Sequence, residues 1–371
     1  MEGKKGTRTG FSTGACATAA TKGALLALLR QEVIGQIEIT LPVGQRVVFS
    51  IAECNIGPNE ARCGVIKDAG DDPDVTHGAT IRATVSFIET PGAVLLEAGE
   101  GVGRVTQPGL GLPVGAPDIT RVPRKMMTDV VEELAAAQLR ERGMKVVLSV
   151  PGGEELAKKT ELIRLGVIGG IGILGTTGIV RPYSTAAFRA GIGIGVASAA
   201  ARGYRHLVVT TGGMSEKFAL RWIDLPEGAF IQMGDFVGYA LEQCVKRHIE
   251  RVTISGMIGK LSKMAMGKMM THAAGSDVDT GFLAQLAGLS GAPEEVVEEI
   301  LEANTARQVA EIAQARGLAA FFDRLAVRVC EACRRHVKGE LEIECLLTDF
   351  EGNVIGRGRV GNGSGKGSAT R

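Results

Sequence analysis

The sequence predicts an α/β protein in two parts: an N-terminal α+β domain with antiparallel strands, then a Rossmann-like α/β domain with a parallel sheet. The apolar pattern changes along the chain, from short segments that alternate apolar and polar residues to short, nearly continuous apolar runs. A length of 371 residues is also too great for one small core. We place the domains at residues 1–142 and 143–358, with a flexible tail at 359–371.

The N-terminal part begins with a helix near residues 14–30. Four alternating segments follow it, separated by Pro, Gly and Asn: QIEITLP, QRVVFSI, RCGVIKD and ATIRATVSF. Alternation with a period of two is typical of antiparallel strands with one buried face. The next segment, PRKMMTDVVEELAAAQLRERG, has apolar residues at helical spacing and ends at Gly143, which favours a helix C-cap.

The second part alternates apolar runs with helical segments. The runs are MKVVLSV, HLVVTTG, GAFIQMG and RVTISGM, and this alternation is typical of a parallel sheet with helices on both faces. Ligands of such sheets bind at the carboxyl ends of the strands, which here are VPGGE, TTGGMSE, MGD and SGMIGK. ELEIECLLT and NVIGRG predict a final hairpin, and GNGSGKGSATR is linker-like.

Composition excludes several classes of partner. The 42 basic and 41 acidic side chains nearly cancel, so we expect neither nucleic acid nor a membrane surface as a partner. The N-terminus lacks the pattern of a secretory signal, and the apolar stretch Leu165–Val180 is too short to span a membrane, so we predict a cytoplasmic protein. Seven cysteines without framework spacing indicate reduced thiols, and a homo-oligomer is compatible with this composition.

The stretch TRTGFSTGACATAATKG crowds hydroxyl residues and glycines at the entrance of the first helix. One interpretation is a helix cap with close packing, and the other is a pocket for an anionic ligand. In the second interpretation Thr13 and Gly14 contact the ligand and Lys22 supports them. Cys16 lies in the first helical turn, where a lowered thiol pKa is one alternative and a small packing residue is the more common one.

GDDPDVTHG, residues 70–78, places three carboxylates and a histidine in one turn. One alternative is an Asx-type turn between strands, in which Asp71 or Asp72 satisfies backbone donors. The spacing of the aspartates does not match an EF-hand loop, so we predict no metal site. The other alternative is a polar wall, in which Asp and His side chains orient a ligand or transfer a proton.

GGIGILGTTGIVRPYS, residues 169–184, combines a glycine loop with paired threonines. Such a loop offers backbone N–H groups and hydroxyls to an anion, and Arg181 adds a charge suited to a carboxylate. The alternative is a buried, close-packed turn. GEGVGRV near residue 99 is similar to a dinucleotide loop, but we discount it because no helix is evident after it.

Two further segments carry polar residues with more than one interpretation. In GMIGKLSKMAMGKMMTH, residues 256–272, Lys260 lies close to a strand end where we expect a ligand. The alternative is a helix with a stripe of methionines and a solvated stripe of lysines, and Thr271 with His272 forms either a polar site or a turn. CEACRRH suggests zinc, but no second ligand pair lies at suitable spacing, so we predict buried thiols in an amphipathic helix that begins at Ala319.

Six segments occur together in the order seen in one known family. They are RTGFSTGACATAATKGA, AGDDPDVTHGA, GEGVGRVTQPGL, VPGGEELAKKT, RLGVIGGIGILGTTGIVRPYS and GKLSKMAMGKMMTHAAGSDVD. Each segment alone is a weak signal, whereas the ordered set is highly specific. The sequence resembles the CbiD family of anaerobic cobalamin biosynthesis from about residue 7 to about residue 280, with a looser match onwards to the final hairpin.

The resemblance implies an S-adenosylmethionine-dependent methyltransferase that acts on C-1 of cobalt-precorrin-5B and gives cobalt-precorrin-6A. The cobalt belongs to the tetrapyrrole substrate, and no protein-bound metal is implied. An enamine-like ring carbon attacks the sulfonium methyl group in line, so the enzyme mainly aligns the reactants and shields them from water. The carboxylates of the tetrapyrrole suit helix N-termini, hydroxyls, lysine and arginine.

The resemblance also implies roles for matched positions. For proton transfer that adjusts the ring tautomer we expect His77, Asp72 or His272. We expect the cofactor at a loop of four residues: Gly175, Thr176, Thr177 and Gly178. We expect substrate contacts from nine residues: Thr13, Gly14, Lys22, Asp71, Thr76, Arg181, Ser184, Lys260 and Thr271.

The sequence departs from the family pattern at four positions. We expect Asn where Thr120, Leu162 and Met270 stand, and Ser where Gly172 stands. One hypothesis is that the substrate contacts are altered towards a related tetrapyrrole, and a second alternative is a non-catalytic tetrapyrrole carrier. A nicotinamide-dependent oxidoreductase is disfavoured, because SVPGGEEL lacks the G-x-G-x-x-G spacing.

Overall fold

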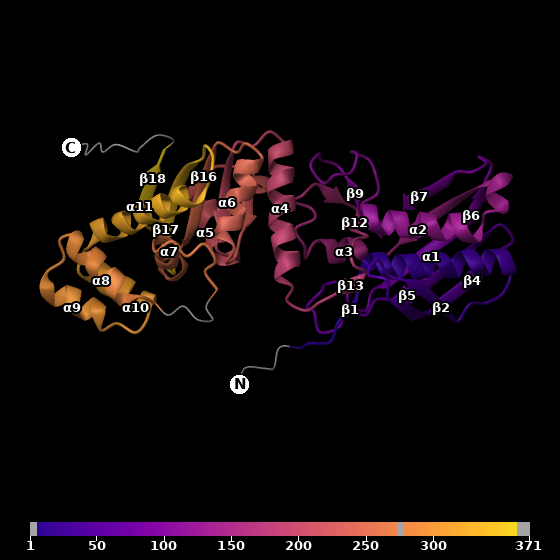
Figure 1. Ribbon diagram of the computed structural model, residues 1–371, viewed down its shortest axis with the longest axis horizontal. Helices are drawn as coiled ribbons and strands as arrows, with labels where there is room; N and C mark the ends of the chain where they lie inside the picture. Colours follow the sequence, from indigo (N-terminus) through magenta and orange to yellow (C-terminus); the bar gives the residue numbers. More distant parts are fainter. Residues whose placement is uncertain (1–5, 273–277, 362–371) are drawn as a thin grey trace. The chain divides into compact units, whose positions relative to one another are not determined.

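Figure 1 shows the computed structural model, which describes residues 6–272 and 278–361. The chain divides into unit 1, Met1–Ser184, and unit 2, Thr185–Arg371. Each unit has a hydrophobic core and is described by itself. Both units contain helices and strands, which confirms the prediction of a mixed α/β protein.

The main sheet of unit 1 has five strands in the order β4-β5-β6-β10-β7. The strands are β4 (Glu53–Ile56), β5 (Glu60–Ile66), β6 (Thr80–Ile88), β7 (Val94–Ala98) and β10 (Gly143–Ser149). Neighbouring strands are antiparallel except for β10 and β7, which are parallel. Along most of β6 every second residue is buried, as its alternating sequence predicts.

Helix α1 (Thr13–Arg30) packs against β5 and β6 of this sheet and against α2 (Arg121–Leu134). Its buried residues are mostly small, so the helix fits closely between its neighbours. The buried Thr18 and Thr21 hydroxyls each donate to the carbonyl four residues earlier, at 2.8 Å. These bonds satisfy polar side chains inside the core.

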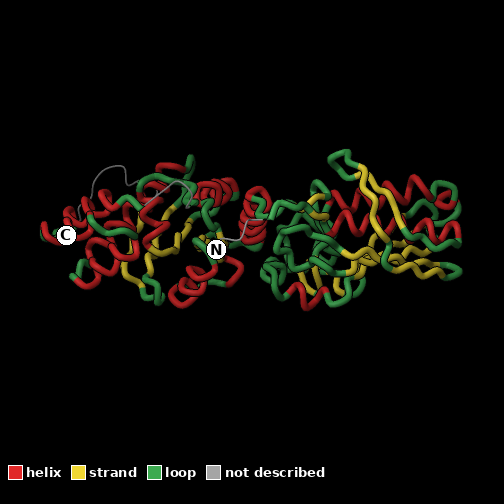
Figure 2. Tube along the Cα trace, turned by 90° about the horizontal axis from the view of Figure 1, so that it is seen from below, coloured by secondary structure: helices red, strands yellow, loops and turns green. Residues whose placement is uncertain are grey.

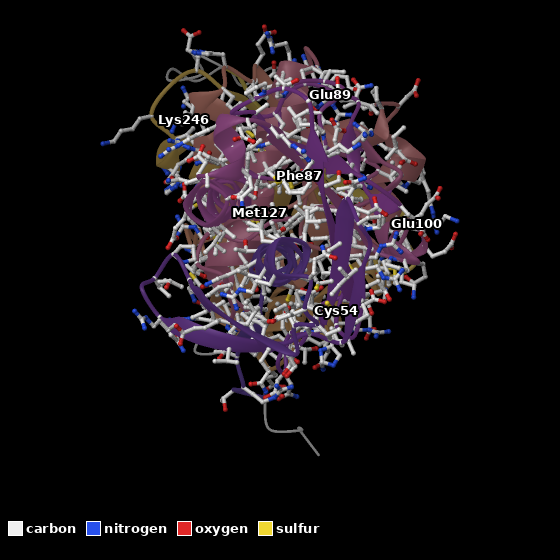
Figure 3. All side chains as sticks on the ribbon, turned by 90° about the vertical axis from the view of Figure 1, so that its right-hand side faces the viewer. Cys54, Phe87, Glu89, Glu100, Met127 and Lys246 are labelled. Atoms are coloured by element: carbon white, nitrogen blue, oxygen red, sulfur yellow. The ribbon has the colours of Figure 1, made fainter. Side chains whose placement is uncertain are left out.

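The core of unit 1 fills the space between these helices and the sheet. Met127 of α2 is fully buried in it, and Phe87 of β6 and Cys54 of β4 pack at its margin. Figure 3 labels these three residues, which belong to three separate elements. Long-range packing of this kind, rather than local propensity, stabilises elements as small as β4.

Unit 1 also contains smaller strand pairs, one between neighbouring segments and three between distant ones. Two of the alternating segments form the hairpin of β2 (Gln36–Thr40) and β3 (Arg46–Ser50). Three short pairings follow: β1 (Gly10–Phe11) with β13 (Ile179–Val180), β8 (Gly101–Val102) with β12 (Gly170–Ile171), and β9 (Arg104–Val105) with β11 (Val167–Ile168). Helix α3 (Gly153–Ala157) lies between β10 and β11 in the sequence.

The sheet of unit 2 has the order β15-β14-β16-β17-β18. Its strands are β14 (His206–Thr210), β15 (Phe230–Gln232), β16 (Arg251–Met257), β17 (Glu342–Thr348) and β18 (Val354–Val360). All neighbours are parallel except β17 and β18, which form the predicted final hairpin. The first strand of this sheet in the chain, β14, therefore lies between the next two.

Helices cover both faces of this sheet. They are α4 (Thr185–Ala201), α5 (Gly213–Trp222), α6 (Val237–Lys246), α7 (Ile258–Ala265), α8 (Thr280–Leu289), α9 (Glu294–Leu301), α10 (Ala306–Ala315) and α11 (Ala319–His336). Val208 of β14 packs with Ala219 of α5, whereas its neighbours Leu207 and Val209 belong to the core that contains residues of α6 and α11. In Figure 2 the yellow strands of unit 2 lie among red helices.

The division of the chain differs from the boundary expected at residues 142 and 143. It falls after Ser184, because β10 pairs with β6 and β7 in unit 1 instead of opening the sheet of unit 2. Gly143 is the first residue of β10 and not a helix C-cap, since α2 ends at Leu134. Of the expected tail, residues 359 and 360 belong to β18, and 362–371 lie outside the described residues.

No helix within the described ranges is both long enough and apolar enough to cross a membrane.

Candidate functional site

The GDDPDVTHG turn of unit 1 is organised around a buried lysine. The Lys67 side chain is 1% exposed, and its Nζ donates to Asp74 Oδ2 at 2.6 Å. Asp74 Oδ1 accepts from the N–H and the hydroxyl of Thr76, at 2.8 and 2.5 Å. Burial opposes the ionisation of Asp74, but the hydrogen bonds from Lys67 and Thr76 outweigh burial and lower its pKa. Thr76 thus bonds within the turn itself.

Arg8 connects this turn to the N-terminal segment. Its guanidinium donates to both oxygens of Asp68, and its backbone N–H donates to Asp71 Oδ2 at 2.8 Å. The hydrogen bond from Arg8 lowers the pKa of Asp68 to about 2. Asp71, an expected substrate contact, therefore holds the N-terminal segment of its own chain.

Asp72 and His77 occupy different positions in the turn. Asp72 Oδ1 accepts from the N–H of Tyr183 at 3.1 Å, which fastens the turn to the segment that carries Arg181. Tyr183 has a φ of 54°, an uncommon value for a residue with a side chain. The N–H of Ala69 donates to His77 Nδ1 at 3.1 Å, so the neutral ring carries its hydrogen on Nε2. The His77 side chain is 53% exposed and accessible to a ligand.

A groove lies between the N-terminal segment and the segment around β13. Six residues line its volume of about 510 Å³: Gly6, Thr7, Thr9, Ile179, Arg181 and Pro182. The Arg181 residue is exposed, so its guanidinium is accessible together with two threonine hydroxyls. A guanidinium with neighbouring hydroxyls is suited to a carboxylate ligand.

The entrance of α1 is filled by the glycine loop of the same unit. The N–H of Gly14 donates to Leu174 O at 2.9 Å, and the Thr13 hydroxyl donates to Gly172 O at 3.0 Å. Both Thr13 and Gly14 are buried. Carbonyl oxygens of the chain thus occupy the place where an anionic ligand was expected, and the capping interpretation of this stretch describes the structure.

The loop of residues 175–178 exposes only part of its length. A side chain at Gly175 would overlap Ser12 Oγ, and Gly178 is buried. Thr176 and Thr177 are exposed, but the Thr177 hydroxyl bonds to the backbone two residues on. Thr176 is therefore the side chain of this loop best placed to contact a ligand.

Two other residues of unit 1 were expected to contact substrate. Lys22 Nζ donates to Glu38 O at 2.7 Å and so connects α1 to β2. Ser184 is partly buried and ends the unit, three residues after Arg181.

A polar cluster lies at the carboxyl ends of three strands in unit 2. Lys260, in the first turn of α7, donates from Nζ to Thr211 O at 2.9 Å and lies 3.0 Å from Asp235 Oδ1. The Thr271 hydroxyl donates to the same Oδ1 at 2.9 Å. Burial opposes the ionisation of Asp235, but the hydrogen bonds from Lys260 and Thr271 lower its pKa. We call Asp235, Lys260, Thr211 and Thr271 the edge cluster.

The expected site residues therefore lie in both units. Asp72, His77 and Arg181 are in unit 1, and Lys260, Thr271 and the exposed His272 are in unit 2. Asp235, which joins Lys260 to Thr271, was not singled out from the sequence, although the MGD segment that contains it was recognised as a strand end.

The cysteine-rich segment forms no metal site. Within residues 6–272 and 278–361 no three potential ligands are grouped so that they could hold a metal ion. Cys330 and Cys333 are fully buried in α11, and burial raises the pKa of the Cys333 thiol to about 12. Burial also raises the pKa of the Cys16 thiol to about 12. These findings confirm the buried thiols predicted for the segment of Cys330 and Cys333, and of the two alternatives for Cys16 they favour the packing residue.

Comparison with known proteins identifies the family of this chain. A family described as CbiD matches residues 1–182, and one described as CbiD, C-terminal domain, matches residues 270–359. The cobalt-precorrin-5B C(1)-methyltransferase of Geobacillus kaustophilus (strain HTA426) is 50% identical over 358 residues, or 96% of each chain. The chain belongs to the CbiD family.

Two further proteins are similar to this chain. The cobalt-precorrin-5B C(1)-methyltransferase of Priestia megaterium is 47% identical over 351 residues, which cover 94% of this chain and 95% of that protein. A crystal structure of the cobalamin biosynthesis protein (cbiD) from Archaeoglobus fulgidus covers 84% of this chain and 85% of its own, with 24% identity and a TM-score of 0.38. The first CbiD match ends two residues before the end of unit 1.

Two of the four positions at which the resemblance led us to expect another residue lie near a buried carboxyl group. The Thr120 hydroxyl donates to Ile173 O at 3.3 Å, and a side chain at Gly172 would overlap Asp118 Oδ2. Asp118 is 6% exposed, and burial raises its pKa to about 6. Nothing in the sequence pattern singles out Asp118, because its burial depends on contacts between distant segments. Of the other departures, Leu162 packs at the core and Met270 is exposed beside Thr271.

Proposed function

We propose that this chain methylates C-1 of cobalt-precorrin-5B with S-adenosylmethionine as the methyl donor and forms cobalt-precorrin-6A. The observation that carries the proposal is 50% identity over 96% of both chains with a protein named cobalt-precorrin-5B C(1)-methyltransferase. This alignment includes residues of both units, so neither unit is left without a counterpart in that relative.

The groove of unit 1 is the proposed contact for the tetrapyrrole. Its accessible Arg181 can bind a substrate carboxylate through two parallel N–H bonds, and Thr7 and Thr9 add hydroxyl donors. Hydrogen bonds that Asp71 accepts from the backbone N–H of Arg8, and Asp72 from that of Tyr183, hold the segments that form the groove. A groove with walls fixed in this way reduces the cost of orienting a large ring.

When bound, S-adenosylmethionine supplies an electrophilic methyl group, so the side chains of this protein need to align the ring and move a proton. Among the expected proton-transfer residues, His77 is accessible and carries its hydrogen on Nε2 in the neutral form. In that tautomer Nε2–H can donate a hydrogen bond that orients the ring, while the proton that the ring loses on methylation passes to solvent. We assign Asp72 a positioning role, since its Oδ1 is bonded to the backbone of Tyr183.

Methyl transfer from labelled S-adenosylmethionine tests the function directly. Purified protein incubated with cobalt-precorrin-5B should place one labelled methyl group on the tetrapyrrole. Transfer to a related tetrapyrrole but not to cobalt-precorrin-5B would support an altered substrate, as the four departures suggest. A protein that binds the tetrapyrrole but neither binds S-adenosylmethionine nor transfers methyl would be a carrier, and the proposal would be wrong.

A further inference from the structure

The first strands of the unit 2 sheet form a βαβ unit of the kind that binds nucleosides. The order β15-β14-β16 places β14 between the two strands that follow it in the chain, with helices on both faces. In sheets of this topology ligands bind outside the carboxyl ends of the strands, at the point where the strand order reverses. In unit 2 this point lies between β14 and β16, at the loop Thr211–Gly213.

This loop leaves its backbone open to a ligand. Gly212 has a φ of 153°, and a side chain built there would meet no atom within 4 Å. At Gly213 the nearest atom would be 3.8 Å away, in the side chain of Gln232. Helix α5 begins at Gly213, and the first N–H groups of a helix have no partner within it. These N–H groups are therefore available to a negatively charged or polar group.

An acidic side chain lies where a ribose would need it. In nucleoside-binding units of this topology, a carboxylate about 20 residues after the glycine loop accepts a hydrogen bond from a ribose hydroxyl. Asp235 has this spacing from Gly213 and follows β15. Its Oδ1 receives the bonds from Lys260 and Thr271, and neither bond uses Oδ2. The edge cluster therefore orients one carboxylate oxygen and leaves the second for a ligand.

Two buried hydroxyls beside the loop are a second, independent sign of a polar ligand. Thr210 and Ser255 are 0% exposed, and neither Thr210 Oγ1 nor Ser255 Oγ has a hydrogen-bond partner among the described residues. The two residues are opposite each other in β14 and β16, and Thr210 shares with Val208 the face of the sheet that α5 covers. A buried hydroxyl without a partner destabilises a protein. The carboxyl end of this sheet thus keeps polar groups that the protein does not satisfy.

The charges near the loop favour one class of nucleoside ligand. Glu216 is buried in the first turn of α5, where its carboxylate would repel the pyrophosphate of a dinucleotide. S-adenosylmethionine has no phosphate, and its amino-acid end carries an ammonium group as well as a carboxylate. TTGGMSE also lacks the G-x-G-x-x-G spacing that pyrophosphate binding requires.

We propose that the carboxyl edge of the unit 2 sheet binds the adenosyl cofactor, with Asp235 Oδ2 accepting from a ribose hydroxyl and the start of α5 facing the amino-acid end, whose ammonium group is compatible with Glu216. This inference rests on the proposed function, since it assumes that S-adenosylmethionine is the methyl donor. It places the cofactor in unit 2 and not at residues 175–178 of unit 1, where the resemblance led us to expect it.

Hydrogen–deuterium exchange of the unaltered full chain locates the cofactor without any substitution. S-adenosylhomocysteine, the demethylated product, serves as the probe. It should slow exchange in peptides that cover residues 210–216 and 233–236. Protection confined to residues 172–180 would overturn the proposal and favour the loop of unit 1.

Calorimetric titration of variants with the same probe gives a second measurement. Asp235→Asn keeps an oxygen for Lys260 and Thr271 but replaces the other carboxylate oxygen with an N–H₂ group. It should weaken binding of S-adenosylhomocysteine by about 10- to 100-fold. Asp224→Asn, an exposed carboxylate elsewhere in unit 2, and Thr176→Val in unit 1 should leave binding unchanged. A loss of binding in Thr176→Val with none in Asp235→Asn would contradict the proposal.

Two outcomes separate this location from the function itself. If the chain methylates cobalt-precorrin-5B but the probe protects only residues outside unit 2, the location is wrong and the function stands. If the unaltered chain neither binds the probe nor transfers methyl, both proposals fail. Should Asp235→Asn lower the melting temperature, the exchange pattern of the unaltered chain decides.

Discussion

The Nζ atom of the buried Lys67 lies 2.6 Å from Asp74 Oδ2, and this ion pair forms the centre of the GDDPDVTHG turn. Removing one partner of a buried pair leaves a charge without compensation and destabilises a protein by about 3–5 kcal/mol. We expect a loss of this size from Asp74→Asn, which retains an oxygen for Thr76 but no charge for Lys67. Urea denaturation at pH 7 measures it.

Lys67→Met is the matched control for this pair. It removes the buried charge, and the remaining Asp74 is partly exposed and still bonded to Thr76, so we expect a smaller loss. Folding lowers the pKa of Asp74, so the stability from its ionised form is present above its usual value of 3.8 and is lost as the pH falls further. Equal losses in the two variants at pH 7 would contradict an electrostatic role for the pair.

Arg181 should determine how tightly the tetrapyrrole binds. Arg181→Ala removes the accessible guanidinium of the groove, and we expect KM for cobalt-precorrin-5B to rise by about 10- to 100-fold. Arg181→Lys retains the charge but not the paired N–H geometry, so its KM should lie between those of the unaltered chain and Arg181→Ala. Steady-state kinetics with a fixed concentration of S-adenosylmethionine measures both. An unchanged KM in Arg181→Ala would place the substrate carboxylates elsewhere.

Asp118 should make unit 1 less stable as the pH rises. Burial raises its pKa from 3.8 to about 6, so its favourable contribution is fully present below pH 3.8 and is lost as the pH rises through about 6. This difference between the two pKa values corresponds to about 3 kcal/mol in the free energy of unfolding. Asp118→Asn cannot ionise, and we expect it to be more stable than the unaltered chain by up to this amount at pH 8. Melting curves at pH 4 and pH 8 should show the difference only at the higher pH.

Gly172 and Asp118 should behave as a coupled pair. A serine at Gly172, which the resemblance led us to expect, would place its Cβ against Asp118 Oδ2, so we expect Gly172→Ser to be destabilising by about 1–3 kcal/mol. Asp118→Ala removes the obstructing carboxyl group and should recover most of that loss in the double variant. A double-mutant cycle measured by urea denaturation reports the coupling. Additive effects would show that the two side chains do not compete for this space.

The cysteines should differ sharply in reactivity. All seven lie within the described residues; six are buried, and Cys54 is partly exposed. Thiols whose pKa burial has raised, such as Cys16 and Cys333, react slowly with disulfide reagents. Titration with 5,5′-dithiobis(2-nitrobenzoic acid) should detect at most one fast thiol in the native protein and seven in guanidinium. Cys54→Ala should abolish the fast phase, and a second fast thiol would contradict this burial.

The spacing of apolar residues correctly identified the helices and strands that bury one face. α1, β2, β3, β5 and β6 lie where the sequence predicts them, because each alternates or repeats with the period of its own geometry. β10 was assigned to the wrong sheet. A strand next to the edge of a mixed sheet can be as continuously apolar as one in a parallel sheet. The apolar pattern of β10 therefore does not show that it pairs with β6 and β7, because this pairing depends on residues far away in the sequence.

The candidate site shows the same division between local and non-local information. Residue types indicated that Lys260 lies near a strand end and that Thr271 belongs to a polar site or a turn, but their meeting at Asp235 depends on three strands and a loop. The entrance of α1 was interpreted as free for an anion because no sequence pattern shows that Leu174 O occupies it. Chemical types were therefore predictable, whereas the partners of each group were not.

The closure of the α1 entrance has a consequence for the order of events during synthesis. Thr13 and the residue that accepts its hydrogen bond, Gly172, are 159 positions apart in the chain. At about 5–20 residues per second, a ribosome takes about 10–30 s to add that interval. Throughout this time the first helix can form, but its N–H groups face water and β1 lacks β13. The last part of unit 1 to be synthesised thus supplies the carbonyl groups that bind the start of α1. A nascent chain that stops before residue 172 lacks these hydrogen bonds.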